Sequence, residues 1–190
     1  MDYLEDIKSN ETLIVSFGGY AHAIGGIQPF EFLNFLKVFD TDKLYLKDSF
    51  SSSYHKGVKG ISTDVDTTVE YLRNYIKRYS KVLFIGNSGG GYAAVLFGSL
   101  LNVEYVLAFV PTTILIKNDK DPRYKNLKPL INLITEYHIY GDTSVTNFND
   151  PHHIHHCENI NNFVKRINGL NLKKLRDSGE LYSIINNILT

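Results

Sequence analysis

Residues 81–98, which read KVLFIGNSGGGYAAVLFG, contain the feature that decides the fold. Residues 82–85 form an apolar run typical of a buried strand, and residues 93–101 show the small-residue pattern of a helix. The turn between them, residues 86–90, reads GNSGG and fits the pattern G-x-S-x-G, with Ser88 at its centre. After a strand and before a helix, this pattern predicts a sharp turn that lifts the serine hydroxyl above the carboxyl edge of a sheet.

The surroundings of Ser88 favour chemistry at its hydroxyl. Bulky neighbours would clash in so tight a turn, so small residues flank the serine. The hydroxyl is expected at a helix N-terminus, where free N–H groups and the helix dipole stabilise developing negative charge. The N–H of Gly89 is therefore a candidate oxyanion donor.

A phosphate-binding loop is the competing interpretation of the same glycines. Residues 89–94 also fit the dinucleotide fingerprint G-x-G-x-x-A. That fingerprint normally follows the first strand of its unit, with an acid at the end of the next strand. Here the next strand ends in Val110 and Pro111, and the nearest acid, Glu104, precedes it. A P-loop is excluded because the G-K-[ST] sequence is absent.

Strands and helices alternate along the chain, and several strands are apolar on both faces, which is typical of a parallel sheet covered on both sides. The predicted class is a three-layer α/β sandwich whose mostly parallel sheet has about six strands, in a single domain over residues 1–190. A Thr63–Asp66 capping pair is expected to start one helix, and Asp177 and Glu180 to cap the last. The strands are predicted at 12–17, 43–46, 82–85, 105–110, 134–140 and 163–167, and further helices at 29–39 and 93–101.

The composition narrows the class of protein. Twenty Lys and Arg balance twenty Asp and Glu, which argues against nucleic acid or an anionic membrane as a partner. A single cysteine, Cys157, leaves no intramolecular disulfide and suits a reducing compartment. The N-terminal residues 1–11 (MDYLEDIKSNE) lack the apolar segment of a signal peptide, and no apolar run approaches the ~20 residues of a membrane span. We therefore expect a cytoplasmic protein.

Taken together, residues 86–90 in their strand–helix context, residues 16–22 (SFGGYAH) and residues 107–111 (LAFVP) resemble the α/β-hydrolase superfamily, in its small members that lack a large lid. The resemblance implies a serine hydrolase that uses Ser88 as nucleophile, needs no cofactor, and acts on a small-molecule or carbohydrate ester. It also implies that the loop after an early strand supplies part of the oxyanion hole. The candidate oxyanion residues are thus Gly18, Gly19, Tyr20 and Gly89.

The resemblance implies the chain order Ser, then Asp or Glu, then His for the rest of a triad. The acid is Asp142, directly behind the strand at 134–140, or Asp150, which is favoured because Asp150 and His153 form a D-x-x-H pattern. In similar proteins the histidine stands close to the glycine after the last strand. Here Gly169 is followed by Leu and Asn, and no histidine occurs beyond His156.

The base must therefore come from an unusual place if it exists. The stretch 150–158 (DPHHIHHCE) offers four histidines, of which His153 and His156 are taken as catalytic candidates. The same cluster, with Cys157 and Glu158, has metal-competent side chains, or it is a solvated loop. The departure at the base also leaves open a non-catalytic binding protein of this fold. His152 and His155 belong to the same cluster, and His22 is a possible neighbour of the site. His55 is expected to be a surface or structural residue, and His138 a satisfied buried residue within a strand. Asp48, Tyr54 and Lys56 are expected to line the cleft.

Overall fold

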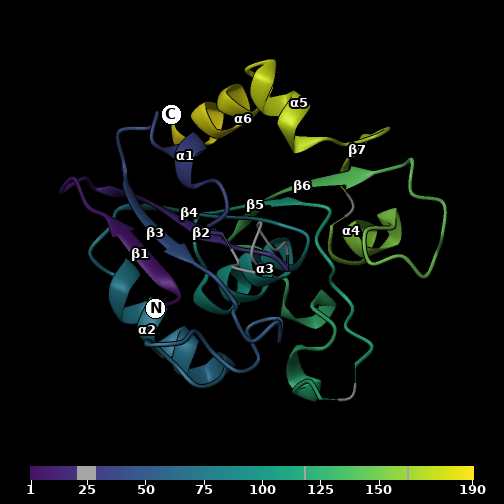
Figure 1. Cartoon of the computed structure of the whole chain (residues 1–190), viewed down its shortest axis with the longest axis horizontal. Helices are drawn as coiled ribbons and strands as arrows, with labels where there is room; N and C mark the ends of the chain where they lie inside the picture. Colours follow the sequence, from purple (N-terminus) through teal and green to yellow (C-terminus); the bar gives the residue numbers. More distant parts are fainter. Residues whose placement is uncertain (21–28, 118, 162) are drawn as a thin grey trace.

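A computed structural model of the chain describes residues 1–20, 29–117, 119–161 and 163–190. A seven-stranded sheet runs through the centre in the order β1-β3-β2-β4-β5-β6-β7, as Figure 1 shows. All neighbouring strands are parallel except β1, which pairs antiparallel with β3 at one edge. The strands are β1 Tyr3–Asp6, β2 Thr12–Phe17, β3 Asp42–Leu46, β4 Lys81–Asn87, β5 Tyr105–Phe109, β6 Glu136–Asp142 and β7 Lys165–Ile167.

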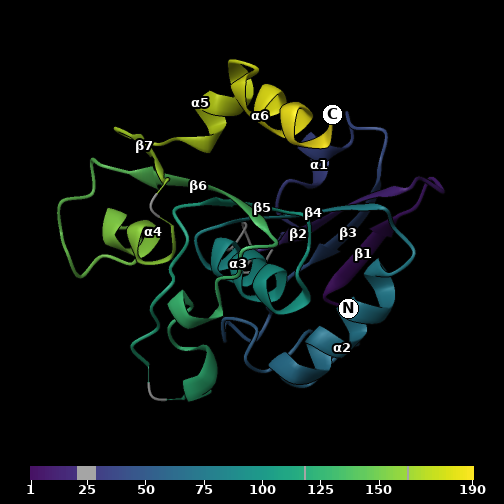
Figure 2. The same cartoon turned by 180° about the vertical axis from the view of Figure 1, so that it is seen from behind.

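Helices cover both faces of the sheet, in the three-layer arrangement predicted from the sequence. On one face lie α2, α3 and α4, and on the other lie α1, α5 and α6 (Figures 1 and 2). The helices are α1 Leu33–Leu36, α2 Val65–Ile76, α3 Gly89–Leu101, α4 Ile154–Ile160, α5 Leu172–Asp177 and α6 Glu180–Leu189, with 3-10 turns η1 Pro122–Tyr124 and η2 Lys128–Leu130. In the part of the chain that the structure describes, no helix has the length and apolar character of a membrane span.

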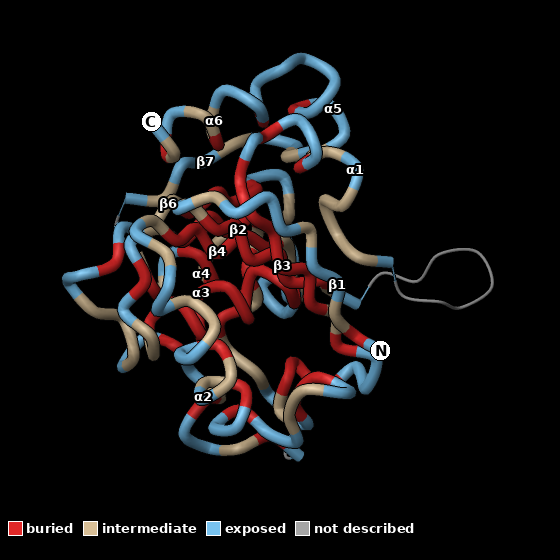
Figure 3. The backbone as a smooth tube through the Cα atoms, turned by 90° about the vertical axis from the view of Figure 1, so that its left-hand side faces the viewer, coloured by how far each residue is buried: buried red, intermediate tan, exposed pale blue. Residues whose placement is uncertain are grey.

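The core explains why the central strands read as apolar on both faces. Successive side chains of a strand point to opposite sides of the sheet. In β4, Phe84 packs into the cluster that contains α2 and α3, while Leu83 and Ile85 pack into the cluster beneath α1, α5 and α6. All three side chains are fully buried, and the tube in Figure 3 shows the sheet as the buried centre of the molecule.

Three elements escaped prediction because their local patterns are weak. Strand β1 has four residues, none of them an inward-facing buried residue, and it lies at the sheet edge. Helix α4 begins in the histidine cluster, and α5 is only six residues long. Conversely, the helix predicted at 29–39 shrinks to the four residues of α1.

Two predicted helix caps are wrong by a residue or more. Helix α2 starts at Asp64, whose side chain accepts a hydrogen bond from the Thr67 N–H in a reciprocal capping box, so Thr63 and Asp66 are not the capping pair. Helix α6 follows Gly179 in a left-handed conformation (φ 78°), while Asp177 is the last residue of α5. Glycine reaches this conformation without steric cost, which suits the break between the two helices.

The parallel strands bring distant segments to one edge of the sheet. The turn after β2 contains Gly18 and Gly19, the turn after β4 contains Ser88, and the loop after β6 leads through Asp150 to α4. These segments all leave the carboxyl ends of their strands, which is where open α/β sheets bind their ligands.

Candidate active site

Ser88 occupies a strained turn between β4 and α3. Its backbone torsions are φ 54° and ψ −117°, a region that non-glycine residues rarely adopt. The Ser88 N–H donates to the Phe109 carbonyl at 2.9 Å, and the Ser88 carbonyl accepts from the Tyr92 N–H at 2.9 Å. The backbone of the serine is thus fixed from both sides, and its side chain is left free to turn toward the loop after β6.

The glycines two residues before and after Ser88 are needed for close backbone contact. A Cβ atom on Gly86 would lie 2.1 Å from the Gly90 carbonyl oxygen, and one on Gly90 would lie 2.1 Å from the Phe17 carbonyl oxygen. Real Cβ atoms do not approach backbone so closely. The first and last glycines of the G-x-S-x-G pattern are therefore explained by space.

An imidazole lies against the serine hydroxyl, and it belongs to His152. The distance from Ser88 Oγ to His152 Nε2 is 2.6 Å, within hydrogen-bond range. The other ring nitrogen, Nδ1, lies 3.5 Å from Asp150 Oδ1. The same carboxylate oxygen accepts the backbone N–H of His152 at 2.8 Å, so Asp150 also shapes the turn that carries the histidine. Ser88, Asp150 and His152 therefore lie next to one another, in the chain order Ser, Asp, His that the resemblance implies.

The two histidines favoured from the sequence, His153 and His156, lie elsewhere, and the imidazole that contacts the Ser88 hydroxyl is that of His152. His153 is the N-cap of α4 and accepts the His155 N–H through Nδ1. His156 is buried, and its Nδ1 accepts the Ile114 N–H at 3.3 Å. Burial, reinforced by the neighbouring histidines, lowers the pKa of His156 to about 4. Both side chains therefore stabilise the local structure around α4, and neither is hydrogen-bonded to Ser88.

Asp142, the alternative acid, is engaged in loop structure. Its Oδ1 accepts hydrogen bonds from the Ser144 N–H and hydroxyl and from the Gly169 N–H. Burial acts to raise the pKa of this carboxyl, but the hydrogen bonds from Ser144, Gly169 and Leu170 hold it below its ordinary value. Asp142 thus fastens the end of β6 to the segment after β7, and Asp150 is the acid that lies beside the histidine.

The four candidate oxyanion donors separate into two pairs. The Gly18 N–H donates to the Leu46 carbonyl at 2.8 Å, and the Gly19 N–H donates to Glu31 Oε2 at 3.0 Å. Within the described ranges, the N–H groups of Tyr20 and Gly89 have no protein acceptor. Gly89 is the first residue of α3, and the Tyr20 ring lies over it, so the two segments meet beside Ser88. Of the four candidates, Tyr20 and Gly89 are therefore the two whose N–H groups are not occupied by a described acceptor.

Glu31 is a functional-site neighbour that the sequence did not reveal. Its carboxylate holds the Gly19 N–H and also interacts with the Asn87 side chain, which joins the turn after β2 to the end of β4. Burial raises the pKa of Glu31 to about 7 from an ordinary value of 4.5, in spite of those hydrogen bonds. The folded protein therefore keeps a proton on Glu31 that the unfolded chain has already released at pH 5 to 7.

We expect ionisation of Glu31 to cost stability as the pH rises. Stability falls where the folded state binds more protons than the unfolded state, here from about pH 4.5 to about pH 7. One pKa unit corresponds to about 1.4 kcal/mol, and roughly 2 to 3 kcal/mol of the loss falls between pH 5 and pH 8. Glu31→Gln removes this titration, and urea unfolding of both proteins at pH 5 and pH 8 measures it. The free energy of unfolding of the wild type, relative to that of Glu31→Gln, should fall by that amount from pH 5 to pH 8. A difference that is the same at both pH values would contradict the raised pKa of Glu31.

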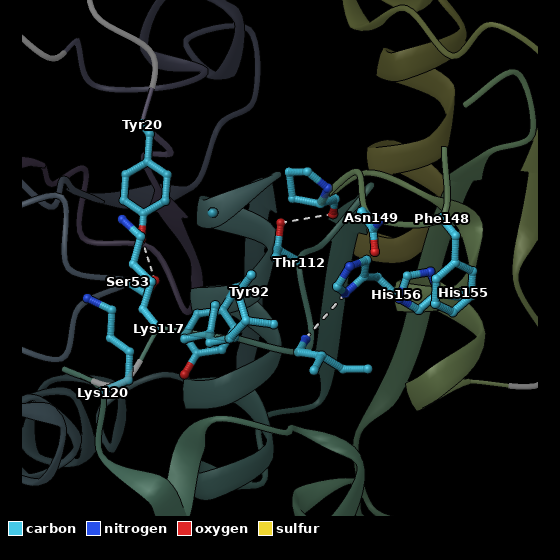
Figure 4. Close-up of a pocket in the computed structure, with 15 residues that line it drawn as sticks. Tyr20, Ser53, Tyr92, Thr112, Lys117, Lys120, Phe148, Asn149, His155 and His156 are labelled. Atoms are coloured by element: carbon cyan, nitrogen blue, oxygen red, sulfur yellow. Dashed lines mark hydrogen bonds between the residues drawn. The ribbon is translucent and has the colours of Figure 1, made fainter. Parts of the chain in front are cut away.

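A cavity of about 610 Å³ is lined in part by Gly89, the residue after Ser88. Figure 4 draws the residues that line it. Two of its lining residues are sequence neighbours of the site: Gly89 follows Ser88, and Pro151 precedes His152. A third, Thr112, donates its N–H to the Ser88 carbonyl. Its walls are mostly apolar and aromatic, and its fifteen lining residues are Tyr20, Ser53, Gly89, Tyr92, Thr112, Ile114, Leu115, Ile116, Lys117, Lys120, Phe148, Asn149, Pro151, His155 and His156.

Asp48, Tyr54 and Lys56, which were expected to line the cleft, are not among the described residues that line this cavity. Asp48 and Tyr54 are buried, and the Asp48 carboxylate accepts the N–H groups of Ser52 and Tyr54. Lys56 is exposed, and His22 lies outside the described residues. His55 is structural, as expected, because it is hydrogen-bonded to Tyr92 and to the Asp121 N–H.

A metal centre at the histidine cluster finds no support in the described side chains. Across residues 1–20, 29–117, 119–161 and 163–190, no three His, Cys, Asp or Glu side chains are arranged to hold a metal ion. In place of such an arrangement, the His155 ring stacks on Phe148 with centroids 4.2 Å apart and packs against His156. Burial raises the pKa of Cys157 to about 12, so this cysteine stays a buried thiol.

Comparison with known proteins identifies the architecture. No protein-family model matches the chain, and no curated protein sequence matches it. Among solved structures, the capsule O-acetyltransferase of Neisseria meningitidis serogroup A matches with a TM-score of 0.70 and 16% identity over 99% of this chain and 91% of that one. A mutant of the same enzyme in complex with CoA matches similarly, with a TM-score of 0.69.

Two further structures carry the same arrangement. The fluorophosphonate-binding serine hydrolase FphF of Staphylococcus aureus matches with a TM-score of 0.60 and 12% identity over 97% of this chain and 86% of that one. This chain therefore has an α/β-hydrolase fold. The carboxylesterase Cest-2923 of Lactobacillus plantarum shares the α/β-hydrolase fold at a TM-score of 0.57 and 9% identity, over 88% of this chain and 76% of that one. At these identities the comparisons show the fold, which hydrolases, esterases and an O-acetyltransferase share.

The sequence did not predict which histidine of this α/β-hydrolase fold would contact Ser88. His152 precedes α4, on the same loop as Asp150, instead of following the last strand. The sequence did carry a local signal. The Asp150–Pro151 pair favours a turn, and the N-cap His153 uses its side chain to bind the first turn of α4. In DPHH this leaves His152 as the histidine of the turn itself.

Proposed function

We propose that the protein is a serine-dependent acyl-transfer enzyme that cleaves a small ester through an acyl intermediate on Ser88. The 2.6 Å contact between Ser88 Oγ and His152 Nε2 carries this proposal. A serine hydroxyl is a weak nucleophile until an adjacent base takes its proton. A strained turn that presents the hydroxyl, a base in contact with it and two open N–H groups are the parts that such chemistry needs.

The proposed first half-reaction forms a new ester on the enzyme. Ser88 Oγ attacks the carbonyl carbon of the substrate, and His152 Nε2 takes the hydroxyl proton. The carbonyl oxygen gains the negative charge, which the N–H groups of Tyr20 and Gly89 stabilise. When the tetrahedral intermediate collapses, the bond to the leaving oxygen breaks, and His152 returns its proton to that oxygen. An alcohol leaves, and the acyl group remains on Ser88.

The second half-reaction repeats these steps with another nucleophile. Water, activated by His152, gives a carboxylic acid, whereas an acceptor alcohol gives a new ester. In both cases Ser88 regains its proton. The comparisons support both outcomes, because proteins of this fold include serine hydrolases, a carboxylesterase and an O-acetyltransferase. An acylated small molecule or carbohydrate is the proposed substrate.

Asp150 is the proposed orienting acid of His152. Its oxygen lies 3.5 Å from Nδ1, beyond a good hydrogen bond, and both side chains are about two-fifths exposed. A modest shift of the loop in the substrate complex would shorten this contact, as happens in active sites that tighten on binding. Asp142, with three hydrogen bonds to the loops around β7, has no comparable access to the imidazole.

Labelling with a fluorophosphonate tests the proposal directly. The probe phosphonylates an activated serine, so the wild-type protein is expected to be labelled and Ser88→Ala is expected to give no label. Ser144→Ala serves as the matched control, because Ser144 is a loop serine bound to Asp142 and away from His152. Absence of labelling in the wild type, or equal labelling of Ser88→Ala, would sink the proposal and leave a non-catalytic binding protein of this fold.

A further inference from the structure

Positive charge is concentrated at one side of the cavity. Among the described residues that line it, the two formally charged side chains are Lys117 and Lys120. The imidazoles of His155 and His156 also line it, but burial lowers the pKa of each, so both are neutral at pH 7. Figure 4 shows both lysines on the side occupied by Tyr20 and Ser53, and the imidazoles with Phe148 on the opposite side.

Lys120 is the more informative of the two lysines because it is buried. Its side chain is 4% exposed, while Asp119, whose carboxylate lies 3.3 Å from Lys120 Nζ, is 60% exposed. A buried charge is costly unless it is well paired, and an exposed carboxylate is a weak partner. The nearby Asp48 carboxylate attracts Lys120, but its oxygens accept the N–H groups of Ser52 and Tyr54. Lys120 thus retains the capacity to bind an anion in the cavity.

The segment that carries Lys120 is tied to the helix that starts at the serine turn. The Asp121 N–H donates to His55 Nδ1 at 2.9 Å, and His55 Nε2 then donates to the Tyr92 hydroxyl at 2.9 Å. That hydroxyl donates to the Tyr124 carbonyl at 2.7 Å. Burial lowers the pKa of His55 to about 4, which keeps the imidazole neutral and able to accept. Because Tyr92 is one helical turn after Ser88, the chain of hydrogen bonds fixes the lysine side of the cavity relative to the serine.

The wall between the two ends of the cavity is apolar. Figure 4 places Tyr92 and Thr112 between the lysines and the imidazole side, and Leu115 and Ile116 contribute further apolar surface. Such a lining suits an uncharged spacer and leaves orientation to a few polar groups. A molecule whose acyl carbon lies at Ser88 would therefore direct any charged end toward the lysines.

We infer that the substrate of the proposed acyl transfer carries a phosphate or similar anionic group, which Lys120 and Lys117 bind while its acyl carbon lies at Ser88. The inference rests on the proposed function and adds the chemical class of the substrate. The anion has two sources: an ester of a phosphorylated alcohol, or a thioester donor whose carrier is phosphorylated. The chemistry of recognition is the same for both, so the experiment separates them.

Two matched substrate pairs test the inference. The first is acetyl-CoA against S-acetyl-N-acetylcysteamine, and the second is 4-acetoxybutyl phosphate against 4-acetoxybutanol. Within each pair the reacting acyl group is the same and the anion differs. We expect kcat/KM to be at least about ten-fold higher for the phosphorylated member of one pair, since a hydrogen bond to a charged group is worth that much. The pair that shows the preference identifies the source.

Substitutions assign the preference to the lysines. In Lys117→Gln/Lys120→Met we expect kcat/KM for the phosphorylated substrate to fall about ten- to a hundred-fold, with the neutral substrate changed less than about two-fold. Lys128→Gln, an exposed lysine of η2 outside the cavity, is the matched control and should change neither. Lys117→Gln alone, at an exposed side chain, guards against a folding defect from the buried Lys120.

The outcomes separate the inference from the proposed function. Fluorophosphonate labelling of the double variant reports on Ser88 and should persist, because neither lysine contacts the Ser88 hydroxyl. Calorimetric binding of CoA against pantetheine, and of butyl phosphate against butanol, reports on the lysines without turnover. The inference is overturned, and the proposed function stands, if the wild-type protein is labelled at Ser88 but shows no preference for acetyl-CoA or 4-acetoxybutyl phosphate and binds neither CoA nor butyl phosphate. Equal loss for charged and neutral substrates in the double variant overturns it as well.

Discussion

His152→Ala is expected to lower kcat/KM for 4-nitrophenyl acetate by about a thousand-fold or more, with the fold retained. His152 Nε2 lies 2.6 Å from Ser88 Oγ, and no other described imidazole contacts that hydroxyl. General-base catalysis contributes about 10² to 10⁴ in rate, and the loss of a base that acts together with its nucleophile falls at the upper end. His152 is partly exposed and caps no helix, so its removal leaves the packing of α4 in place. Steady-state kinetics and thermal unfolding of the same preparations measure the two effects.

His153→Ala is the matched control, one residue further along the chain. This histidine holds the first turn of α4 through the His155 N–H and does not contact Ser88. We expect its loss to cost about 1 kcal/mol of stability, as for other N-caps, and to change kcat/KM less than about five-fold. A large kinetic loss in His153→Ala together with normal activity in His152→Ala would refute the assignment of the base.

These two neighbouring histidines show how far the sequence determines the site. The turn that carries Ser88 was predictable because its sequence signals are local: a strand before it, a helix after it and glycines two residues away on both sides. The base was not predictable in the same way, because its identity depends on which ring of a loop after β6 faces a turn after β4. Ser88 and His152 are 64 positions apart in the chain and are brought together by the sheet. The turn signal in DPHH marks His152, but no local pattern encodes that its ring faces Ser88.

The strands also differ in how well the sequence predicts them. Strands β2, β4 and β5 lie in the middle of the sheet, are buried on both faces, and were predicted with nearly correct bounds. Strand β1 exists because it pairs with β3, and its own four residues carry no apolar pattern. An edge strand depends on its partner for hydrogen bonds and on few side chains for packing, so its sequence is a weak signal.

The turn after β2, which carries the proposed oxyanion donors, shows a further limit. The sequence indicated residues 18–20 as a group, but three adjacent N–H groups cannot be told apart by type. The structure separates them through partners that are distant in the chain, the Leu46 carbonyl for Gly18 and the Glu31 carboxylate for Gly19. Those partners hold the turn in place, and the Tyr20 N–H has no acceptor among the described residues. Positioning of this kind depends on tertiary contacts and becomes visible only in the folded chain.

Gly86→Ala is expected to destabilise the protein by about 3 kcal/mol or more and to abolish fluorophosphonate labelling. A Cβ atom at residue 86 would lie 2.1 Å from the Gly90 carbonyl oxygen and 2.7 Å from the Gly91 N. Both are backbone atoms of the first turn of α3, so no side-chain rotation relieves the clash, and the helix must move away from β4. Overpacking inside a protein typically costs about 1 to 3 kcal/mol, and a clash with fixed backbone exceeds that range. Urea unfolding gives the change in the free energy of unfolding.

Gly89→Ala separates this effect from the general cost of replacing a glycine in the turn. Its Cβ would meet only the Tyr20 ring, 3.3 Å away, and a ring at the cavity wall yields by a few tenths of an ångström. Alanine is also the better helix former, by up to about 1 kcal/mol. We therefore expect Gly89→Ala to keep stability within about 1 kcal/mol of the wild type. If Gly86→Ala proved equally mild, α3 would not be held against β4 as closely as the turn geometry requires, and the strained presentation of Ser88 would lose its structural cause.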